Sequence, residues 1–139
     1  MTTYALDTNT ISYFLRGEGN VCQHMEYEIF NKGNAYAIPP MVIYEIQRWL
    51  RDNPTKMMKV ASNQFAILLD AVKNKSEMPV EMWETAADIY ISLKTRGLLI
   101  GDADILIAAY CITCDYTLVT RNSNDFNRIN GLKIVNWFE

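Results

Sequence analysis

Residues 4–16, YALDTNTISYFLR, hold a strand, an acid and a helix in direct succession. Residues 4–6 predict a short buried strand that runs straight into Asp7. A short helix is expected over residues 10–16, because Gly17 follows it and glycine commonly ends a helix. The first carboxylate of the chain therefore stands at the carboxyl end of a strand.

Short apolar runs and amphipathic stretches alternate along the rest of the chain. The amphipathic stretches predict helices over residues 20–31, 41–51, 53–72 (with Asn53 as N-cap and Pro54 as first residue), 81–96 and 103–114. Further strands are expected over residues 35–38, 78–80, 117–120 and 133–135. Strands separated by helices imply an α/β fold, in which a parallel sheet has helices on both faces. Functional sites of such sheets lie beyond the carboxyl ends of the strands.

The composition limits the class of protein. The chain has 139 residues, half of them hydrophobic, which predicts one compact domain over residues 1–139. A formal net charge of −3 excludes a global basic field, so any contact with nucleic acid must be local. The start of the chain lacks the pattern of a signal peptide, and no apolar run approaches about 18 residues. With three cysteines, which cannot all pair, we expect a cytoplasmic protein without a membrane partner.

The segment GDADILIAA, residues 101–109, has acids where apolar side chains are expected. At about 100° per residue, Asp104 falls on the same helix stripe as Ile107, Ala108 and Cys111, which should be buried. An unpaired carboxylate there would cost several kcal/mol, so a proton, a basic side chain or a metal cation must accompany it. The alternative is that the acid caps the amino end of the helix.

Glu45 is a second acid beside an apolar helix stripe, on the helix predicted over residues 41–51. It lies at the edge of the apolar stripe of that helix, which is made by Val42, Ile46, Trp49 and Leu50. A salt bridge to Arg48 is the simpler explanation of this single acid.

A fourth acid, Asp125, closes the polar run that follows the strand expected over residues 117–120. A salt bridge to Arg121 could explain one acid at this edge, but three or four acids together need a common cause. Clustered carboxylates repel one another, so they share protons or bind a hard cation, and Mg²⁺ or Mn²⁺ prefers oxygen ligands.

Five segments, in this order along the chain, resemble those of PIN-domain ribonucleases. They are LDTNTIS (6–12), IYEI (43–46), DILIAA (104–109), LVTRNSNDF (118–126) and GLKIVNW (131–137). Among these ribonucleases, the chain is most similar to the VapC-type toxins of bacterial toxin–antitoxin operons. The resemblance implies a metal-dependent endoribonuclease with a PIN-like three-layer α/β/α fold, whose small parallel sheet is flanked by helices.

Carried over residue by residue, the resemblance assigns catalytic roles to four acids, Asp7, Glu45, Asp104 and Asp125. Asp7 and Asp104 match the most direct ligands of Mg²⁺, with Mn²⁺ as the alternative ion. The fourth position departs from the pattern, because many PIN domains have an Asp where this chain has Asn122. Either Asp125 acts through water, or Asn122 supplies a neutral ligand.

The resemblance also implies roles for polar and basic neighbours of the acids. Asn9 and Thr120 match polar positions that hold the acids in place. The metal would offset the repulsion between a phosphodiester and the attacking water, and Glu45 or Asp125 would orient or deprotonate that water. The candidates for contacts with RNA phosphates are Arg48, Arg51, Lys56 and Lys59, together with Arg121 and Arg128.

A protein partner follows from the likeness to VapC-type toxins. Such a toxin needs a cognate antitoxin that covers the acids. We expect the antitoxin to place apolar side chains in a groove between the helices predicted over residues 41–51 and 53–72, and a cationic side chain at the acids. A homodimer bound by antitoxin chains is expected.

Other functions have weaker support in the sequence. A catalytically weak PIN-fold module that binds RNA or protein stays open because of Asn122. A phosphatase-like enzyme would need a second Asp in DTNT, where this chain has Asn9. Cys111 and Cys114 form a CxxC at the end of a helix, where the helix dipole disfavours the thiolate that redox chemistry needs. Zinc binding would require a second pair of ligands.

Overall fold

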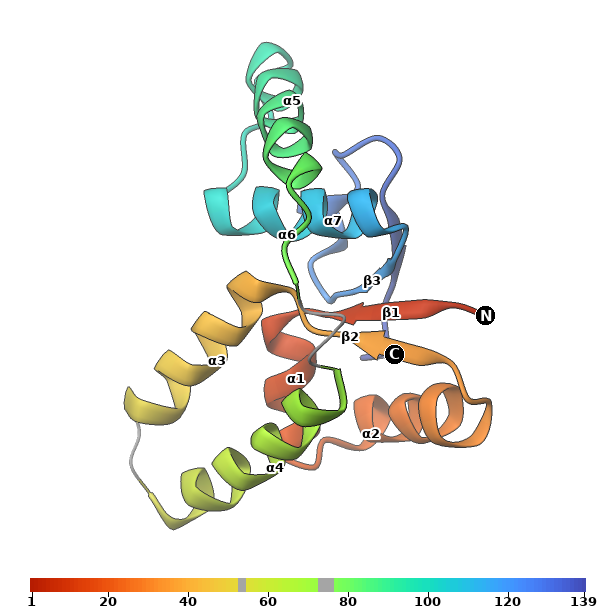
Figure 1. The fold of residues 1–139 in the computed structure, drawn as a ribbon, viewed down its shortest axis with the longest axis vertical. Helices are drawn as coiled ribbons and strands as arrows, with labels where there is room; N and C mark the ends of the chain where they lie inside the picture. The colour runs from red at the N-terminus through yellow and green to blue at the C-terminus, as the bar shows by residue number, and fades with distance from the viewer. Residues whose placement is uncertain (53–54, 73–76) are drawn as a thin grey trace.

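The structure is a computed structural model that describes residues 1–52, 55–72 and 77–139 (Figure 1). Its elements follow in the order β1 (Thr3–Leu6), α1 (Thr8–Leu15), α2 (Gly19–Met25), the π-helix η1 (Glu26–Asn31), β2 (Ala35–Ala37), α3 (Pro40–Asp52), α4 (Lys56–Val72), α5 (Glu81–Thr95), α6 (Asp102–Cys114), β3 (Thr117–Val119), α7 (Ser123–Phe126) and β4 (Lys133–Val135).

The four strands form one parallel sheet in the order β2-β1-β3-β4. In the register of the two central strands, Leu6 of β1 is paired with Val119 of β3. These strands therefore end side by side, so Asp7 and Thr120, which follow them directly, emerge next to each other at the carboxyl edge of the sheet.

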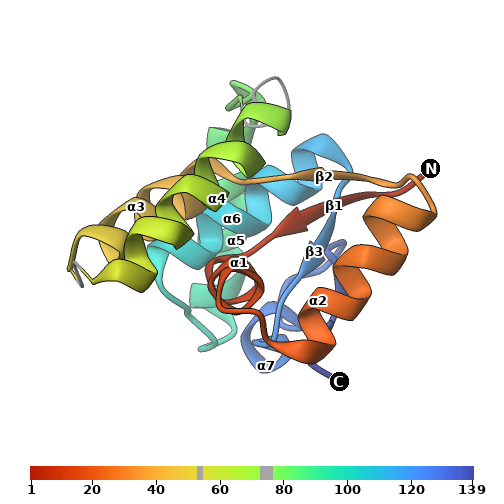
Figure 2. The same ribbon diagram turned by 90° about the horizontal axis from the view of Figure 1, so that it is seen from below.

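Helices cover both faces of the sheet. In Figure 1, α5 and α6 lie above the strands, whereas α1, α2 and α4 lie below them. Figure 2 shows the same molecule from below, with α1 and α2 in front of the strands and α5 and α6 behind. This arrangement confirms the expected three-layer α/β/α fold with a small parallel sheet.

The helix α6 is buried on nearly all sides. Its buried residues are Ile105, Ile107, Ala108, Ala109, Tyr110 and Cys111, as expected of a helix that is apolar all round. It packs against α5, β3 and α3. Because α3 also packs against α1, it bridges two helices that lie on opposite faces of the sheet.

Most predicted elements are present with ends within a few residues of those expected, and three differences stand out. The strand predicted over residues 78–80 is wrong: Met78 and Val80 are exposed, so no neighbouring strand buries them, and the chain turns directly into α5. The helix predicted over residues 20–31 is divided into α2 and η1. The single turn α7 was not predicted, and it buries Phe126. The proposed cap formed by Asn53 and Pro54 lies outside the described residues.

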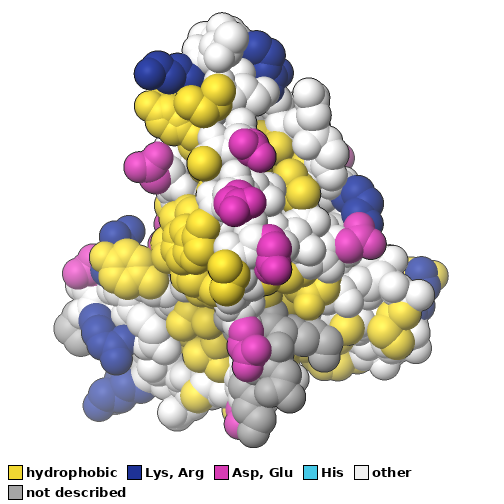
Figure 3. Space-filling model, turned by 45° about the horizontal axis from the view of Figure 1, so that its top comes forward, with side chains coloured by type: hydrophobic (Ala, Val, Ile, Leu, Met, Phe, Trp, Pro, Cys, Tyr) yellow, Lys and Arg dark blue, Asp and Glu magenta, His cyan; other side chains and the backbone are white. Residues whose placement is uncertain are grey.

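The face of the molecule nearest α5 is apolar and acidic. Figure 3 shows acidic side chains along the middle of this face, between patches of hydrophobic side chains, with basic side chains at the margins. The exposed apolar residues on or next to α5 include Val80, Trp83, Tyr90 and Ile91. This face offers no continuous basic surface to a polyanion. No helix in the described part of the chain is long and apolar enough to cross a bilayer.

Candidate functional site

Asp7 is the N-cap of α1, and its side chain is buried. Its Oδ1 accepts hydrogen bonds from the backbone N–H of Thr10 (2.8 Å) and from the Thr10 hydroxyl (2.6 Å). The same hydroxyl lies 3.1 Å from the carbonyl oxygen of Val119 on β3. Burial raises the pKa of Asp7, the hydrogen bonds from Thr10 and Thr120 oppose this shift, and the charge of Glu45 adds to it.

Glu45 reaches the same place from α3. The hydroxyl of Thr8, the first residue of α1, donates a 2.7 Å hydrogen bond to its Oε1. The salt bridge to Arg48, the alternative explanation of Glu45, is absent from the described part of the chain. The Arg48 guanidinium contacts the ring and hydroxyl of Tyr44 instead. Glu45 is thus held by a neutral donor that leaves its negative charge in place.

Asp104 lies in the first turn of α6 and is partly buried. Gly101 is the N-cap residue of this helix, and in the described residues the Asp104 carboxylate has neither a hydrogen bond nor an ion pair. Burial raises its pKa most, and the charges of Glu45, Asp125 and Asp7 raise it further. Because Gly101 is the N-cap residue and the Asp104 carboxylate accepts no hydrogen bond from a helix N–H in the described residues, the capping interpretation is disfavoured.

The fourth acid, Asp125, contacts Asn122, which lines the cavity shared by the other acids, and does not line that cavity itself. The side-chain NH₂ of Asn122 donates to Asp125 Oδ2 (3.1 Å), and Arg128 forms an ion pair with Asp125 Oδ1 (3.5 Å). The backbone N–H of Asn122 donates to the hydroxyl of Thr120 (3.0 Å), which also bonds Asp7. This chain of contacts connects the end of β3 to both acids.

A cavity of about 210 Å³, the acid cavity, lies where these elements meet. It is lined by Asp7, Thr8, Asn9, Glu45, Asp104, Ile107, Asn122 and Phe126. Every polar lining group offers an oxygen, and no Lys, Arg or His of the described residues lines this cavity. Its negative charge is therefore not neutralised by the protein.

Sequence reasoning missed the two threonines that hold the acids, Thr8 and Thr10. The signal was the spacing in DTNT. An Asp at the N-cap accepts a hydrogen bond from the backbone N–H three residues later, and here that residue, Thr10, also has a hydroxyl. Asn9, expected to hold the acids, lines the cavity but is exposed, and its side chain has no hydrogen bond to an acid among the described residues. Thr120 has such a bond, to Asp7.

The basic residues singled out by the sequence separate into different surroundings. Arg48 lines a second cavity, which Glu45 also lines. Arg16 lines this cavity too, although the sequence pattern offered no reason to select it. Arg51 is bonded to Gln47 at the outer surface. Lys56 and Lys59, on α4, are exposed and do not line the acid cavity. Arg121 bonds the hydroxyl of Tyr13 and not an acid.

The surroundings of Cys111 and Cys114 disfavour the thiolate form. Burial raises the pKa of both Cys111 and Cys114, so the thiol forms are favoured over the nucleophilic thiolates. Both cysteines are free.

Comparison with known proteins identifies the family. The family model of the PIN domain matches residues 4–132. The chain belongs to the PIN-domain family. Two curated relatives of this PIN domain are ribonucleases of Rickettsia felis. Ribonuclease VapC2 is 32% identical over 138 residues, which cover 96% of this chain and 97% of the relative. Ribonuclease VapC1 is 30% identical over 130 residues, which cover 94% and 92%.

Solved structures share the same fold as this PIN domain. The crystal structure of VapBC2 from Rickettsia felis, bound to a DNA fragment from their promoter, superposes with a TM-score of 0.83. The match is 27% identical and covers 98% of this chain and 99% of that one. FitAcB from Neisseria gonorrhoeae superposes with a TM-score of 0.84 at 21% identity, again over 98% and 99% of the two chains, and shows the fold alone.

The acids of this PIN domain suit a hard cation that keeps part of its water shell. Within residues 1–52, 55–72 and 77–139, no three His, Cys, Asp or Glu side chains form a ready-made metal cage. Mg²⁺ does not need one, because it usually binds through one or two carboxylates and retains several waters. Carboxylate, amide and hydroxyl oxygens around a small polar cavity therefore fit Mg²⁺ better than zinc, whose sites usually include His nitrogen or Cys sulfur.

Proposed function

We propose that this protein is a single PIN domain over residues 1–139 that acts as a metal-dependent endoribonuclease and as the toxin of a toxin–antitoxin pair. One observation carries the proposal: Asp7, Glu45 and Asp104 come from three different elements and line one cavity without a cationic partner among the described residues. The ribonuclease names of two relatives that are at least 30% identical over most of the chain support it.

Asp7 and Asp104 are the proposed ligands of Mg²⁺, with Mn²⁺ as the alternative. Both carboxylates are desolvated, so a cation would relieve a cost that the metal-free protein carries. Asn122 can offer its carbonyl oxygen, because its NH₂ group is bonded to Asp125. In this arrangement Asn122 is the neutral group at the fourth position, and Asp125 orients it from behind.

When bound, the ion would offset the charge of the phosphodiester and lower the pKa of the attacking water. Glu45 is proposed to orient that water or take its proton, since the Thr8 bond engages only Oε1 and fixes the carboxylate at the cavity. Arg16 and Arg48, which line the neighbouring cavity and have no ion pair in the described part of the chain, are proposed to hold RNA phosphates.

A cognate antitoxin and a homodimer are part of the same proposal. VapBC2 of Rickettsia felis, whose structure this fold matches, is a two-component complex by name. The groove expected between α3 and α4 stays a prediction. An apolar cavity of about 290 Å³ between α1, η1 and α4, lined in part by Phe14, Phe30 and Ile67, is a second place that could receive side chains of such a partner. We place the activity in the cytoplasm, where the proposed RNA substrate is found.

The test is to sequence RNA 5′ ends after brief induction of the wild type beside Asp7→Asn. Asn keeps the capping oxygen of α1 but removes the charge, so the variant should fold. We expect growth arrest and new 5′ ends with the wild type only, and rescue by co-expression of the small open reading frame directly upstream. Identical RNA ends in both strains, or a harmless wild type, would favour a catalytically weak binding module.

A further inference from the structure

We propose that a cavity beside the acids, between α1, the start of α2 and the carboxyl-terminal segment, binds one nucleotide of the RNA next to the cleaved phosphate. We call it the aromatic subsite and define it by Tyr13, Glu18, Val21, Arg121 and Phe138. Its volume of about 390 Å³ lies within the range of small-ligand pockets, roughly 300–1,000 Å³. The assignment rests on the proposed ribonuclease function and adds a second contact for its substrate.

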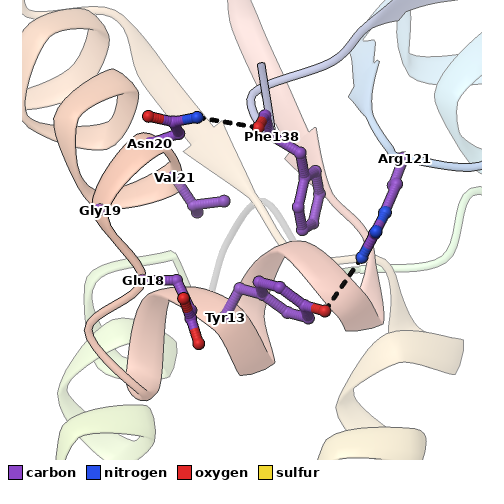
Figure 4. Close-up of a pocket in the computed structure, with 7 residues that line it drawn as sticks. All are labelled: Tyr13, Glu18, Gly19, Asn20, Val21, Arg121 and Phe138. Carbon is purple, nitrogen blue, oxygen red and sulfur yellow. Dashed lines mark hydrogen bonds between the residues drawn. The ribbon is translucent and has the colours of Figure 1, made fainter.

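Phe138 gives the subsite a fixed aromatic wall. Figure 4 shows its ring projecting into the cavity between Val21 and Arg121, above Tyr13. The segment that carries the ring is anchored at both backbone groups: Asn20 Nδ2 donates to the Phe138 carbonyl (3.0 Å), and the Phe138 N–H donates to Asn136 Oδ1 (2.8 Å). An aromatic ring held at the edge of a polar cavity is the usual stacking surface for an unpaired base.

Arg121 supplies a positioned positive charge. Its guanidinium lies 5.4 Å from the ring centroid of Phe138 and 5.7 Å from that of Tyr13, and it donates a 2.9 Å hydrogen bond to the Tyr13 hydroxyl. Arg121 has no ion pair within the described residues, whereas Arg128 is paired with Asp125. A guanidinium that is fixed by stacking and keeps its charge and further N–H groups suits a phosphate or a base.

The aromatic subsite adjoins the acid cavity along two segments of chain. Arg121 is followed directly by Asn122, which lines the acid cavity. Tyr13 lies four residues after Asn9, which also lines the acid cavity, so one lining residue of each cavity lies on the same side of α1, about one helical turn, or 5.4 Å, apart. A single strand can therefore place one phosphate at the acids and the adjoining nucleotide in the subsite.

Glu18 restricts which base fits. Its carboxylate lines the subsite, has no ion pair in the described part of the chain, and can only accept hydrogen bonds. An accepting carboxylate favours a base that presents N–H donors, and guanine has two adjacent donors, N1–H and N2–H, that match the two carboxylate oxygens of this exposed residue. We therefore assign guanine to this position.

The binding test uses metal-free protein in an Asp104→Asn background, with a single-stranded RNA oligomer, by fluorescence anisotropy at several salt concentrations. Arg121→Gln should weaken binding about tenfold and reduce the salt slope by about 0.7, the value for one lost phosphate contact on a single strand. Arg121→Lys should keep most of the slope, because it keeps the charge, but bind more weakly because the stacked plane is lost.

Lys94→Gln is the matched control, because Lys94 also lies over an aromatic ring, that of Tyr90 (5.8 Å), but on α5. It should leave affinity and slope unchanged. An unchanged affinity and slope for Arg121→Gln overturns the subsite, and weaker antitoxin binding by the same variant would assign the cavity to the protein partner instead.

The specificity test sequences the 5′ ends produced by the wild-type enzyme and by Glu18→Gln, with circular dichroism to check folding. We expect a guanine at a fixed position beside the wild-type cut and a relaxed preference in Glu18→Gln. Wild-type cleavage without such a guanine overturns the base assignment. If the wild type cleaves no RNA, the proposed function fails, and the metal-free binding test still decides whether the subsite holds RNA.

Discussion

Thr8 on α1 donates a 2.7 Å hydrogen bond to Glu45 on α3, across 37 residues of sequence. The bond fixes an acid from a second helix beside Asp7, the residue that precedes Thr8. The donor is neutral, so the hydrogen bond does not cancel the negative charge that would attract a cation. The hydroxyl of Thr8 therefore sets the geometry of Glu45 without reducing its charge.

Replacing Thr8 by valine should impair this positioning. Thr8→Val keeps the shape of the side chain and removes the donor, and a hydrogen bond to a charged group contributes about 1.5–3 kcal/mol. We expect kcat to fall about tenfold, corresponding to about 1.4 kcal/mol, with little change in KM. Thr8→Ser keeps the donor and should retain activity. Wild-type kcat in Thr8→Val would mean that Glu45 needs no such support.

The acids should differ in their effect on RNA cleavage. Asp7→Asn and Asp104→Asn should abolish Mg²⁺-dependent cleavage, because both remove a proposed ligand. Asp125→Asn should cost less, about 10–100-fold, because Asp125 is bonded to Asn122 and not exposed in the acid cavity. Cleavage rates of a fluorescent RNA oligomer give the order directly. An equal loss in Asp125→Asn would make it a direct ligand, and activity in both other variants would remove them from the metal site.

Metal-free stability should depend on pH through Asp7 and Asp104. The pKa of each carboxyl is raised on folding, so the folded protein binds protons more tightly than the unfolded chain in the pH range between the ordinary and the raised value. The free energy of unfolding therefore falls as pH rises through that range, and the loss is complete above the raised pKa.

Asp104→Asn removes one of these two contributions. Its thermal midpoint in EDTA at neutral pH should exceed that of the wild type, and the difference should shrink on acidification below the raised pKa. Asp70→Asn, at an exposed position of α4, is the control and should follow the wild-type curve. If the thermal midpoint of Asp104→Asn at neutral pH is below that of the wild type, favourable contacts of the charged Asp104 carboxylate outweigh the cost of its burial.

Divalent cations should stabilise the folded state by mass action. At a Mg²⁺ concentration ten times the dissociation constant, the gain is about 1.4 kcal/mol. Differential scanning calorimetry should show a rise in the thermal midpoint of the wild type with Mg²⁺ or Mn²⁺ that EDTA reverses, and a much smaller rise in Asp7→Asn. The same rise in Asp7→Asn would place the ion elsewhere on the protein.

The sequence alone determined the architecture and two of the acids, because these depend on local pattern. A strand that runs directly into an acid leaves that acid at the carboxyl end of the strand wherever the strand packs, as Asp7 does. An acid on the apolar stripe of a helix must lie at a partly buried position, as Asp104 does. Parallel pairing followed from the alternation of strands and helices, because parallel strands need a crossover connection.

The tertiary structure decided everything that depends on contacts between distant segments. Glu45 joins the other acids only because α3 packs against both α1 and α6, and periodicity within α3 carries no information about those partners. The hydrogen bond from Asn122 to Asp125, on which the proposed role of Asn122 rests, joins two side chains in a way that the sequence pattern does not specify. The surroundings of Arg121 depend on Tyr13, 108 residues away. The local sequence determines on which face of its own helix or strand a side chain lies, whereas the packing of several elements determines which residues that side chain contacts.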